Sequence, residues 1–513
     1  MYPGDADTIG RDTAAVVMTG SGAVRTWGEL DERSNRLANH WHSIGLRRGD
    51  HVALLMENVL EFMEVCWAAD RSGLYYTPIN SHLTADEVRY IVTDCGARSF
   101  VTTAAKSVVA VEAARGNASL ASVLCVGGAP DCMNYEDVIA ACSAEPLEEE
   151  SGGAPMLYSS GTTGVPKGVV RPLPDRHPRE VAGVALALQF AWGGGQQMQY
   201  LSPAPLYHSA PLTFALGTHR LGGTVYVMEK FDAEAALRAI QEHRITHSQW
   251  VPTMFSRMLA LSQDVRDSYD LSSHTHAVHG AAPCPVPLKH AMIQWWGPII
   301  WEYYAGTEGP GSTTVGSVDW LRKPGTVGRA SGSVIHILDD DGNDLPAGQA
   351  GTIYFESPTA AGFSYHGDDA KTQSTRTSNG WATMGDIGYL DEDGYLFLTD
   401  RKAFMIISGG VNVYPQEAEN VLAVHPAVAD VGVFGVPDDD MGEVVHAVVQ
   451  TAPGVVGDDA LAAELIAHCR SQLATIKCPR RIDFETELPR LQTGKLAKAQ
   501  VRDRYVARYS RAG

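Results

Sequence analysis

Helix-like and strand-like hydrophobic patterns alternate along the first half of the chain. In the helix-like segments apolar residues recur every three or four positions, whereas the strand-like segments are short apolar runs. The helix patterns cover 30–42, 59–72, 233–243 and 252–261, the strand patterns cover 51–56, 223–229 and 247–251, and a further strand and helix share 76–95. Strands that alternate with helices form parallel sheets covered by those helices. The pattern therefore predicts α/β architecture for this half.

Short strands and tight turns replace this pattern in the part of the chain after residue 325. Two Asp-Gly pairs, at 341–342 and 393–394, are typical of hairpin turns and indicate an antiparallel, β-rich subregion. Beyond a polar stretch at 399–402, the pattern predicts a helix at 415–424, two strands, a helix at 460–473 and a last strand. This mixture indicates a separate α+β unit.

The length of 513 residues is more than one hydrophobic core usually serves, so at least two domains are expected. We predict a large N-terminal domain over 1–399, made of α/β subdomains with mixed sheets and a β-rich subregion. A small, mobile α+β C-terminal domain is predicted over 400–513, with its hinge at Asp400.

The composition excludes several classes of protein. A net charge of -20 opposes unspecific binding to nucleic acid and to anionic membranes, since both need basic patches. Eight scattered cysteines without a Cys-x-x-Cys pair are typical of free thiols in a reducing compartment. The N-terminus lacks the features of a secretory signal, and no apolar stretch is long enough for a membrane span. We expect a cytoplasmic protein that binds no nucleic acid.

One loop has the composition of a phosphate-binding site. Residues 158–168 have the sequence YSSGTTGVPKG, in which glycines let the backbone approach a polyanion, hydroxyls donate hydrogen bonds and Lys167 adds a positive charge. It is not a Walker A loop, because Gly168 follows the lysine. A flexible serine- and glycine-rich loop is the plainer alternative, but the fixed proline and lysine favour a triphosphate site. Its predicted residues are Ser159, Ser160, Gly161, Thr162, Thr163, Gly164 and Lys167.

With this loop the sequence resembles the acyl-adenylate-forming enzymes, which include acyl-CoA synthetases, firefly-type luciferases and the adenylation domains of peptide synthetases. The family's second nucleotide motif is matched by Tyr304, Ala305, Gly306, Thr307 and Glu308. The resemblance implies that Thr307 contacts the α-phosphate during catalysis and that Glu308 holds Mg²⁺, a cation that favours carboxylate and phosphate oxygens. Taken alone, a Thr-Glu pair is equally typical of a helix start.

Two residues of the β-rich subregion resemble family residues that bind the nucleoside. Asp386 resembles the aspartate whose carboxylate accepts hydrogen bonds from both ribose hydroxyls, and Arg401 resembles the arginine that supports it. Separately, the first is also a common turn residue and the second a common surface charge. Their order along the chain, together with the phosphate loop, favours the nucleotide interpretation.

The resemblance also implies residues around adenine and the acid. The loop of Gly280, Ala281 and Ala282 resembles the one that lines adenine and the carboxylate end of the acid. His208, Trp250 and His279 resemble residues of the substrate pocket. A lone buried histidine or tryptophan is more often part of a core than a ligand contact.

Two segments of the small domain resemble the family's two active-site faces. Lys495 resembles the lysine that stabilises the charge developing when the acid attacks the α-phosphorus, although a polar tail often carries such a lysine. The segment of Ser408, Gly409 and Gly410 resembles the strip beside which the pantetheine arm of coenzyme A passes. Rotation about Asp400 is expected to exchange the two faces.

The resemblance implies an acyl-CoA synthetase that uses ATP, Mg²⁺ and coenzyme A, converts a carboxylic acid to acyl-AMP with release of pyrophosphate, and then forms acyl-CoA, as in fatty acid metabolism. The alternatives are an enzyme that loads the acyl group onto a carrier-protein thiol, a luciferase-like oxygenase, and a non-catalytic nucleotide-binding protein, against which Lys495 counts. An amino-acid activator is disfavoured because 209–216 contains no acidic residue. Analogy at the level of the fold suggests a homodimer.

Three departures from the family pattern stand out. Ala403 and Phe404 replace the usual Lys-Asp pair after the predicted hinge. After Gly168 the family commonly has a Thr-His pair, whereas this chain continues to Arg171 and Pro172. Arg171 is expected to add a cation near the phosphates. The small residues 309–311 after Glu308 are expected to open the acid pocket to bulky acids.

Overall fold

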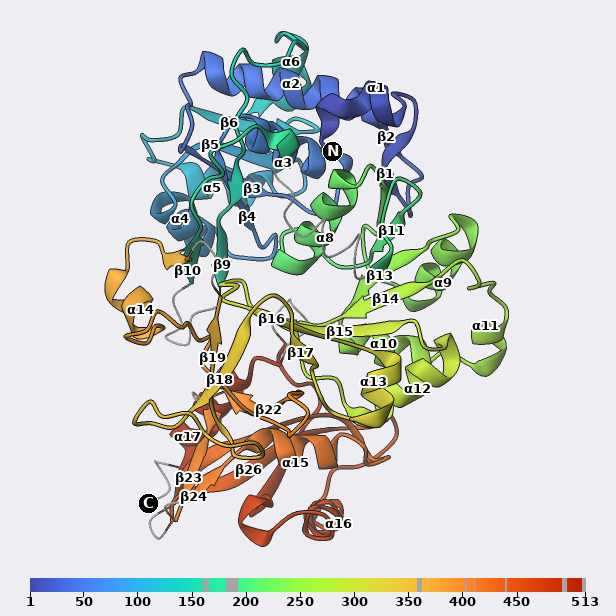
Figure 1. The fold of residues 1–513 in the computed structure, drawn as a ribbon, viewed down its shortest axis with the longest axis vertical. Coiled ribbons are helices and arrows are strands. Elements are labelled where there is room, and N and C mark those ends of the chain that lie inside the picture. The colour runs from blue at the N-terminus through green and yellow to red at the C-terminus, as the bar shows by residue number, and fades with distance from the viewer. Residues whose placement is uncertain are drawn as a thin grey trace.

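The computed structural model describes residues 1–159, 166–180, 192–357, 362–401, 404–409, 411–438, 441–490 and 496–509, apart from the side chains of Ser159, Asp400, Arg401, Asn412 and Tyr509. In Figure 1 a large part, mostly coloured blue to yellow but with α14 (Asp369–Ser374) in orange at its side, contains the N-terminus, and a small part in orange and red lies below it. The described helices include none that is long and apolar enough to cross a membrane.

A six-stranded parallel sheet, of order β7-β6-β5-β3-β4-β8, forms the first layer of the large part. Its strands are β3 (His51–Leu55), β4 (Tyr75–Ile79), β5 (Ala97–Thr103), β6 (Ser122–Val126), β7 (Met133–Asn134) and β8 (Ala154–Pro155). Its helices are α2 (Trp27–Ser43), α3 (Leu60–Arg71), α4 (Ala85–Asp94), α5 (Ser107–Ala114) and α6 (Tyr135–Ala140). Burial of β3 on both faces explains its unbroken apolar sequence. The predicted alternation is confirmed here.

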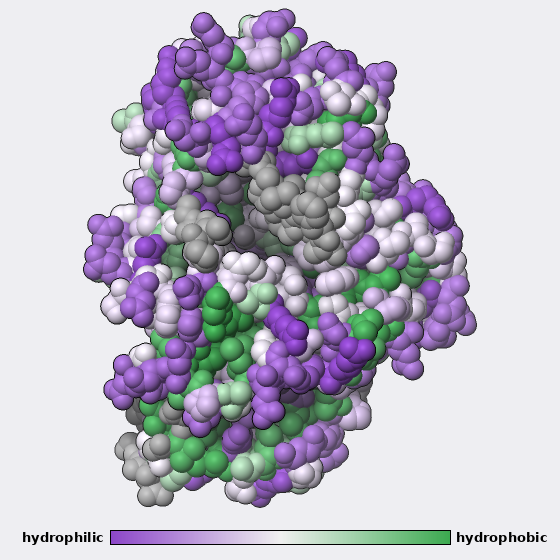
Figure 2. Space-filling view, in the orientation of Figure 1, coloured by the Kyte–Doolittle hydropathy of each residue, from purple (hydrophilic) through white to green (hydrophobic). Residues whose placement is uncertain are grey.

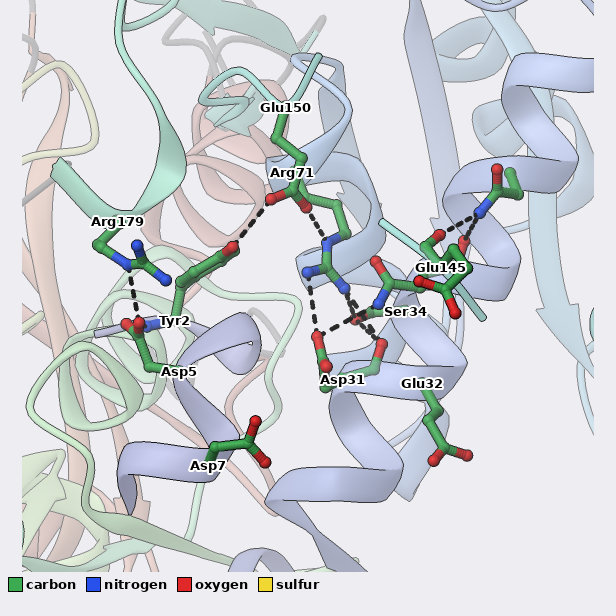
Figure 3. A network of polar contacts seen from close by, with 12 residues as sticks. Tyr2, Asp5, Asp7, Asp31, Glu32, Ser34, Arg71, Glu145, Glu150 and Arg179 are labelled. Atoms are coloured by element: carbon green, nitrogen blue, oxygen red, sulfur yellow. Dashed lines mark hydrogen bonds and ion pairs between the residues drawn. The ribbon is translucent and has the colours of Figure 1, made fainter. Parts of the chain in front are cut away.

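A buried arginine connects α2 and α3 to the N-terminal segment, which contains η1 (Pro3–Asp5) and α1 (Ala6–Ile9) (Figure 3). Arg71 is 1% exposed, and its three guanidinium nitrogens donate to Glu150 (2.6 Å), Ser34 (2.9 Å) and Asp31 (3.1 Å). The hydroxyl of Tyr2 donates to the same Glu150 carboxylate at 2.8 Å. A buried charge is tolerated when it is paired and hydrogen-bonded in this way.

A second, nine-stranded sheet carries the site. Its order is β17-β16-β15-β14-β13-β11-β12-β1-β2, with parallel pairing from β15 to β1 and antiparallel pairing at both edges. The strands are β1 (Ala14–Met18), β2 (Val24–Thr26), β11 (Gln199–Ser202), β12 (Thr224–Val227), β13 (His247–Trp250), β14 (His276–His279), β15 (Ile300–Ala305), β16 (Ser312–Gly316) and β17 (Arg329–Ala330). The parallel strands bring the carboxyl ends of β13, β14 and β15 to one edge, where ligands commonly bind.

Helices accompany this sheet, as the sequence pattern predicts for 233–243 and 252–261. They are α8 (Ser209–Arg220), α9 (Ala233–Glu242), α10 (Pro252–Leu259), α11 (Gln263–Asp267), α12 (Val286–Trp296) and α13 (Ser317–Arg322), with a short turn at η2 (Pro178–Glu180). The Asp232 side chain accepts from the backbone of Ala235 and so begins α9, while Pro252 begins α10.

Two antiparallel sheets contain the strands of the β-rich subregion predicted after residue 325, and one of them also takes in two earlier strands. One contains β9 (Leu157–Ser159), β10 (Lys167–Val170) and β20 (Ser364–Tyr365), next to α14 (Asp369–Ser374). The other contains β18 (Val334–Leu338), β19 (Gly351–Glu356), β21 (Asp386–Leu390) and β22 (Leu396–Arg401). Gly342 and Gly394 have positive φ in the turns between antiparallel partners, as the two Asp-Gly pairs predict.

The small part has its own sheet and its own core. Its strands are β23 (Ile406–Ser408), β24 (Val411–Val413), β25 (Val428–Asp438), β26 (Gly442–Thr451) and β27 (Arg481–Glu485), and its helices are α15 (Pro415–Leu422), α16 (Asp459–Arg470), η4 (Thr475–Lys477) and α17 (Lys498–Tyr509). The predicted division into a large α/β domain and a small α+β domain is confirmed. Because β22 continues through Arg401, the boundary predicted after residue 399 falls inside a strand, and the hinge at Asp400 stays a prediction.

Candidate active site

A cavity of about 3160 Å³ lies where the sheets of the large domain meet the small domain. Figure 2 shows the surface hollowed near the middle of the molecule, above the small domain. The cavity wall includes Lys167, Ala281, Thr307, Asp386 and Arg490, which come from five separate segments of the chain. The fold thus brings together motifs that the sequence places far apart.

The described end of the phosphate loop presents its lysine to this cavity. Strands β9 and β10 flank the loop, with Ser159 paired to Lys167, while residues 160–165 lie outside the described part of the chain. The Lys167 ammonium contacts the carboxylate of Asp368 at 3.0 Å, and this contact raises the pKa of Lys167. Asp368 also accepts from the backbone of Lys371, which lowers the pKa of Asp368. An anionic ligand would compete with Asp368 for the lysine.

The Thr307-Glu308 pair forms a turn between the antiparallel strands β15 and β16, so the helix start considered from sequence is not formed. Both residues line the cavity, and Tyr365 donates its hydroxyl to the Glu308 carboxylate at 3.0 Å. Arg171 donates to the backbone oxygens of Thr307 (3.3 Å) and Glu308 (3.1 Å). The backbone of the second motif is therefore hydrogen-bonded to the residue that directly follows β10.

The carboxylate that the sequence predicts to accept the ribose hydroxyls lies on the first residue of β21. Asp386 is 8% exposed, lines the cavity, and accepts from the Tyr304 hydroxyl at 2.6 Å. The register of β21 and β22 places Arg401 opposite Asp386, although the Arg401 side chain lies outside the described atoms. Tyr304, Asp386 and Arg401, which the sequence separates widely, thus come together in space.

The loop after β14 has a backbone that only particular residues allow. A Cβ on Gly280 would lie 2.7 Å from the ring of Tyr303, so this position requires glycine. Ala281 has φ of +69°, a strained conformation for a residue other than glycine. Ala281 and Ala282 both line the cavity, and their predicted place beside adenine stays a prediction.

Of the three predicted pocket residues, only His208 lines the cavity. Trp250 is 0% exposed and packs against the rings of Phe255 and Trp296. His279 is also 0% exposed, and burial holds its pKa well below the usual value. The structure corrects the prediction for Trp250 and His279, because side chains enclosed in the core do not reach a ligand in the cavity.

The residues 309–311 do not widen the pocket in the way the sequence suggests. A Cβ on Gly309 would lie 1.9 Å from Nη2 of Arg171, and a Cβ on Gly311 would lie 2.2 Å from the ring of Phe355. The space left by both glycines is therefore already filled by protein side chains. The inference of a bulky acid loses its basis.

Sequence reasoning missed a buried ion pair beside the cavity. Glu302 on β15 lines the cavity and lies 2.5 Å from the ammonium of Lys289, which is 0% exposed and also contacts the Trp320 ring at 4.7 Å. Burial raises the pKa of Glu302, and Lys289 opposes this rise. An acidic residue inside an otherwise apolar strand was the available signal.

Residues of the small domain form part of the cavity wall. Arg490 and Leu496, on either side of the segment 491–495 that lies outside the described residues, line the cavity. Ser408 and Gly409 do not line it, and residue 410 is not described. Lys495 itself lies outside the described residues, so its place in the site stays a prediction.

Glu308 is the candidate Mg²⁺ ligand. Among the described residues, no group of three or more His, Cys, Asp or Glu side chains is arranged to hold a metal. One protein carboxylate, that of Glu308, is enough for Mg²⁺, because this cation commonly takes most of its remaining ligands from substrate phosphates and water.

Comparison with known proteins agrees with this geometry. Residues 6–363 match the family model "AMP-binding enzyme" and 417–495 match "AMP-binding enzyme C-terminal domain". Long-chain-fatty-acid–CoA ligase FadD13 of Mycobacterium tuberculosis is 31% identical over 491 residues, which cover 94% of this chain and 93% of that protein. Feruloyl-CoA synthase of an Amycolatopsis species is 31% identical, with 96% of each chain covered. The ATP-bound crystal structure of MatB from Rhodopseudomonas palustris has a TM-score of 0.85 and 28% identity, covering 99% of this chain and 100% of that chain.

Proposed function

This chain belongs to the AMP-binding family of adenylate-forming acid–thiol ligases, and we propose that it is an acyl-CoA synthetase. In the first step a carboxylic acid attacks the α-phosphorus of ATP, which forms acyl-AMP and releases pyrophosphate. In the second step the thiol of coenzyme A attacks the acyl carbon, which forms acyl-CoA and releases AMP. The observation that carries the proposal is the meeting of the phosphate-loop lysine, the Thr307-Glu308 turn and Asp386 on one cavity.

Each of these groups has a role in holding ATP. The Lys167 ammonium is placed to exchange Asp368 for the phosphates, and the Asp386 carboxylate to accept the ribose hydroxyls. Mg²⁺ on Glu308 would neutralise phosphate charge. Thr307 would donate its hydroxyl to the α-phosphate, where negative charge concentrates between two anions during attack. Lys495 would add a positive charge at this point, an electrostatic effect typical of phosphoryl chemistry.

The second step requires the small domain to present its other face. We propose that rotation about Asp400 withdraws the Lys495 segment and brings Ser408, Gly409 and Gly410 to the cavity. Ile407 and Val411, on either side of this strip, are 52% and 47% exposed, which leaves the strip's neighbourhood accessible for such a docking. Gly409 has positive φ, a conformation that favours glycine.

Coenzyme A is proposed as the acceptor and a carrier-protein thiol is the alternative, since both accept an acyl group from the same adenylate. The acid is a separate question, because the named relatives act on fatty and on feruloyl groups. We further propose a cytoplasmic location, in agreement with the cysteines, all eight of which are free thiols.

Pyrophosphate release from MgATP across a panel of aliphatic and aromatic acids tests the proposal, with and without coenzyme A and with mass detection of products. Acyl-CoA formation with one acid supports it. Acyl-AMP that transfers only to a phosphopantetheinylated carrier protein would favour the alternative acceptor. Absence of pyrophosphate release with every acid, despite ATP binding, would contradict enzymatic adenylation.

A further inference from the structure

Two departures from the family pattern meet at one point on the cavity wall. Arg171 directly follows β10, the strand that begins with Lys167 of the phosphate loop. Its Nη2 donates to the backbone oxygens of Thr307 at 3.3 Å and Glu308 at 3.1 Å. One guanidinium thus connects the end of the first nucleotide motif to the second, 137 residues further along the chain.

Gly309 makes room for this contact. It has φ of +54°, and a Cβ at this position would lie 1.9 Å from Nη2 of Arg171, closer than any non-bonded contact allows. A side chain on residue 309 would therefore displace the guanidinium. The contact therefore requires both the guanidinium of Arg171 and the absence of a side chain at Gly309.

The surroundings fix both sides of the contact. Tyr75 donates its hydroxyl to the backbone oxygen of Arg171 at 2.8 Å, which holds the start of the segment after β10. Tyr365, on the strand β20 that pairs with β10, donates to the Glu308 carboxylate at 3.0 Å. Arg171 therefore holds the backbone of the turn, while Tyr365 orients its carboxylate.

We propose that Arg171 is a positioning residue for adenylation, which ties β10 to the Thr307-Glu308 turn so that both motifs keep their spacing when MgATP binds. The proposal rests on the function proposed above. In the proposed complex, triphosphate and Mg²⁺ would contact both motifs at once, and a hydrogen bond from a charged donor to a carbonyl is stronger than a neutral one. Without the tie, the two motifs move independently and the α-phosphate loses its alignment with Thr307 and Glu308.

Arg171→Met tests this role because it keeps an unbranched, flexible stem and removes every side-chain donor. We expect a 10- to 100-fold lower kcat/KM for MgATP in pyrophosphate release, since the loss of one charge-assisted contact acts through the reaction geometry. The Mg²⁺ concentration for half-maximal rate should rise, and the KM for the acid should change less than threefold. Thioester formation from supplied acyl-AMP should stay within twofold of the wild type.

Arg36→Met is the matched control. Arg36 likewise donates to a backbone oxygen, that of Cys142 at 2.6 Å, but it lies on α2 and does not line the cavity. It should leave all these constants unchanged. Arg171→Lys should recover part of the lost rate, because an ammonium of nearly equal reach can still donate to a carbonyl.

A double-variant cycle with Gly309→Ala measures the coupling between the two positions. Alanine at 309 costs activity by displacing Arg171, so its cost should be several-fold smaller in the Arg171→Met background. Full additivity overturns the proposal, as does Arg171→Met with wild-type kcat/KM or with equal losses in both half-reactions. If the wild type releases no pyrophosphate with any acid, titration calorimetry measures the affinity for MgATP instead. Equal affinities of the wild type and Arg171→Met would then overturn the positioning role of Arg171.

Discussion

Replacing Asp386 by alanine tests the proposed ribose site most directly. Asp386 begins β21, is nearly buried, and accepts from the Tyr304 hydroxyl at 2.6 Å on the cavity wall. A carboxylate that accepts from both ribose hydroxyls makes two contacts with ATP and with AMP. The alanine variant loses both of them.

The expected loss follows from the strength of such contacts. A hydrogen bond to a charged group contributes about 1.5–3 kcal/mol, so two contribute at least about 3 kcal/mol. Water enters the wide cavity and replaces part of the interaction, which favours the lower value. A loss of about 3 kcal/mol weakens ATP binding roughly 100-fold. The 2′-hydroxyl alone accounts for roughly a tenfold preference for ATP over 2′-deoxy-ATP, and this preference should fall to about one.

Titration calorimetry with ATP, AMP and 2′-deoxy-ATP measures both effects. Tyr304→Phe is the matched control, because it removes the hydroxyl that donates to Asp386 and keeps the carboxylate and the aromatic ring. This control should retain the preference for ATP. If Asp386→Ala binds ATP and 2′-deoxy-ATP with the wild-type ratio of affinities, the ribose assignment is wrong.

Further predictions concern the two half-reactions and stability. Lys495→Ala should slow acyl-AMP formation roughly 10²- to 10³-fold and spare thioester formation from supplied acyl-AMP, whereas equal losses would contradict the two-face scheme. Asp400→Pro, which locks φ, should retain pyrophosphate exchange and strongly reduce acyl-CoA output; wild-type output would show that the hinge lies elsewhere. Arg71→Met should lower the free energy of unfolding by about 3–5 kcal/mol in urea, because Glu150 and Asp31 lose a buried partner, with ATP affinity unchanged. An unchanged unfolding midpoint would show that the network contributes little.

The sequence alone was enough for features that depend on neighbouring residues. Alternation of apolar runs located β3, α3, α9 and α10 close to their observed bounds, because periodicity and capping act within a few residues. The turn at Gly394 followed from the same local chemistry. The nucleotide motifs were also visible, because each is a short, continuous segment whose order along the chain resembles that of the family.

Only the tertiary structure decided which side chains reach the cavity. Every residue of β13 is buried, so its sequence has no polar alternation to distinguish its faces, and Trp250 lies in the core while its neighbours Gln249 and Val251 line the cavity. The contact between Arg171 and the turn before Gly309 joins distant segments. It depends on the order of β10, β15 and β20 in space, which local patterns do not encode because side chains far apart in sequence interact only after the sheets have assembled.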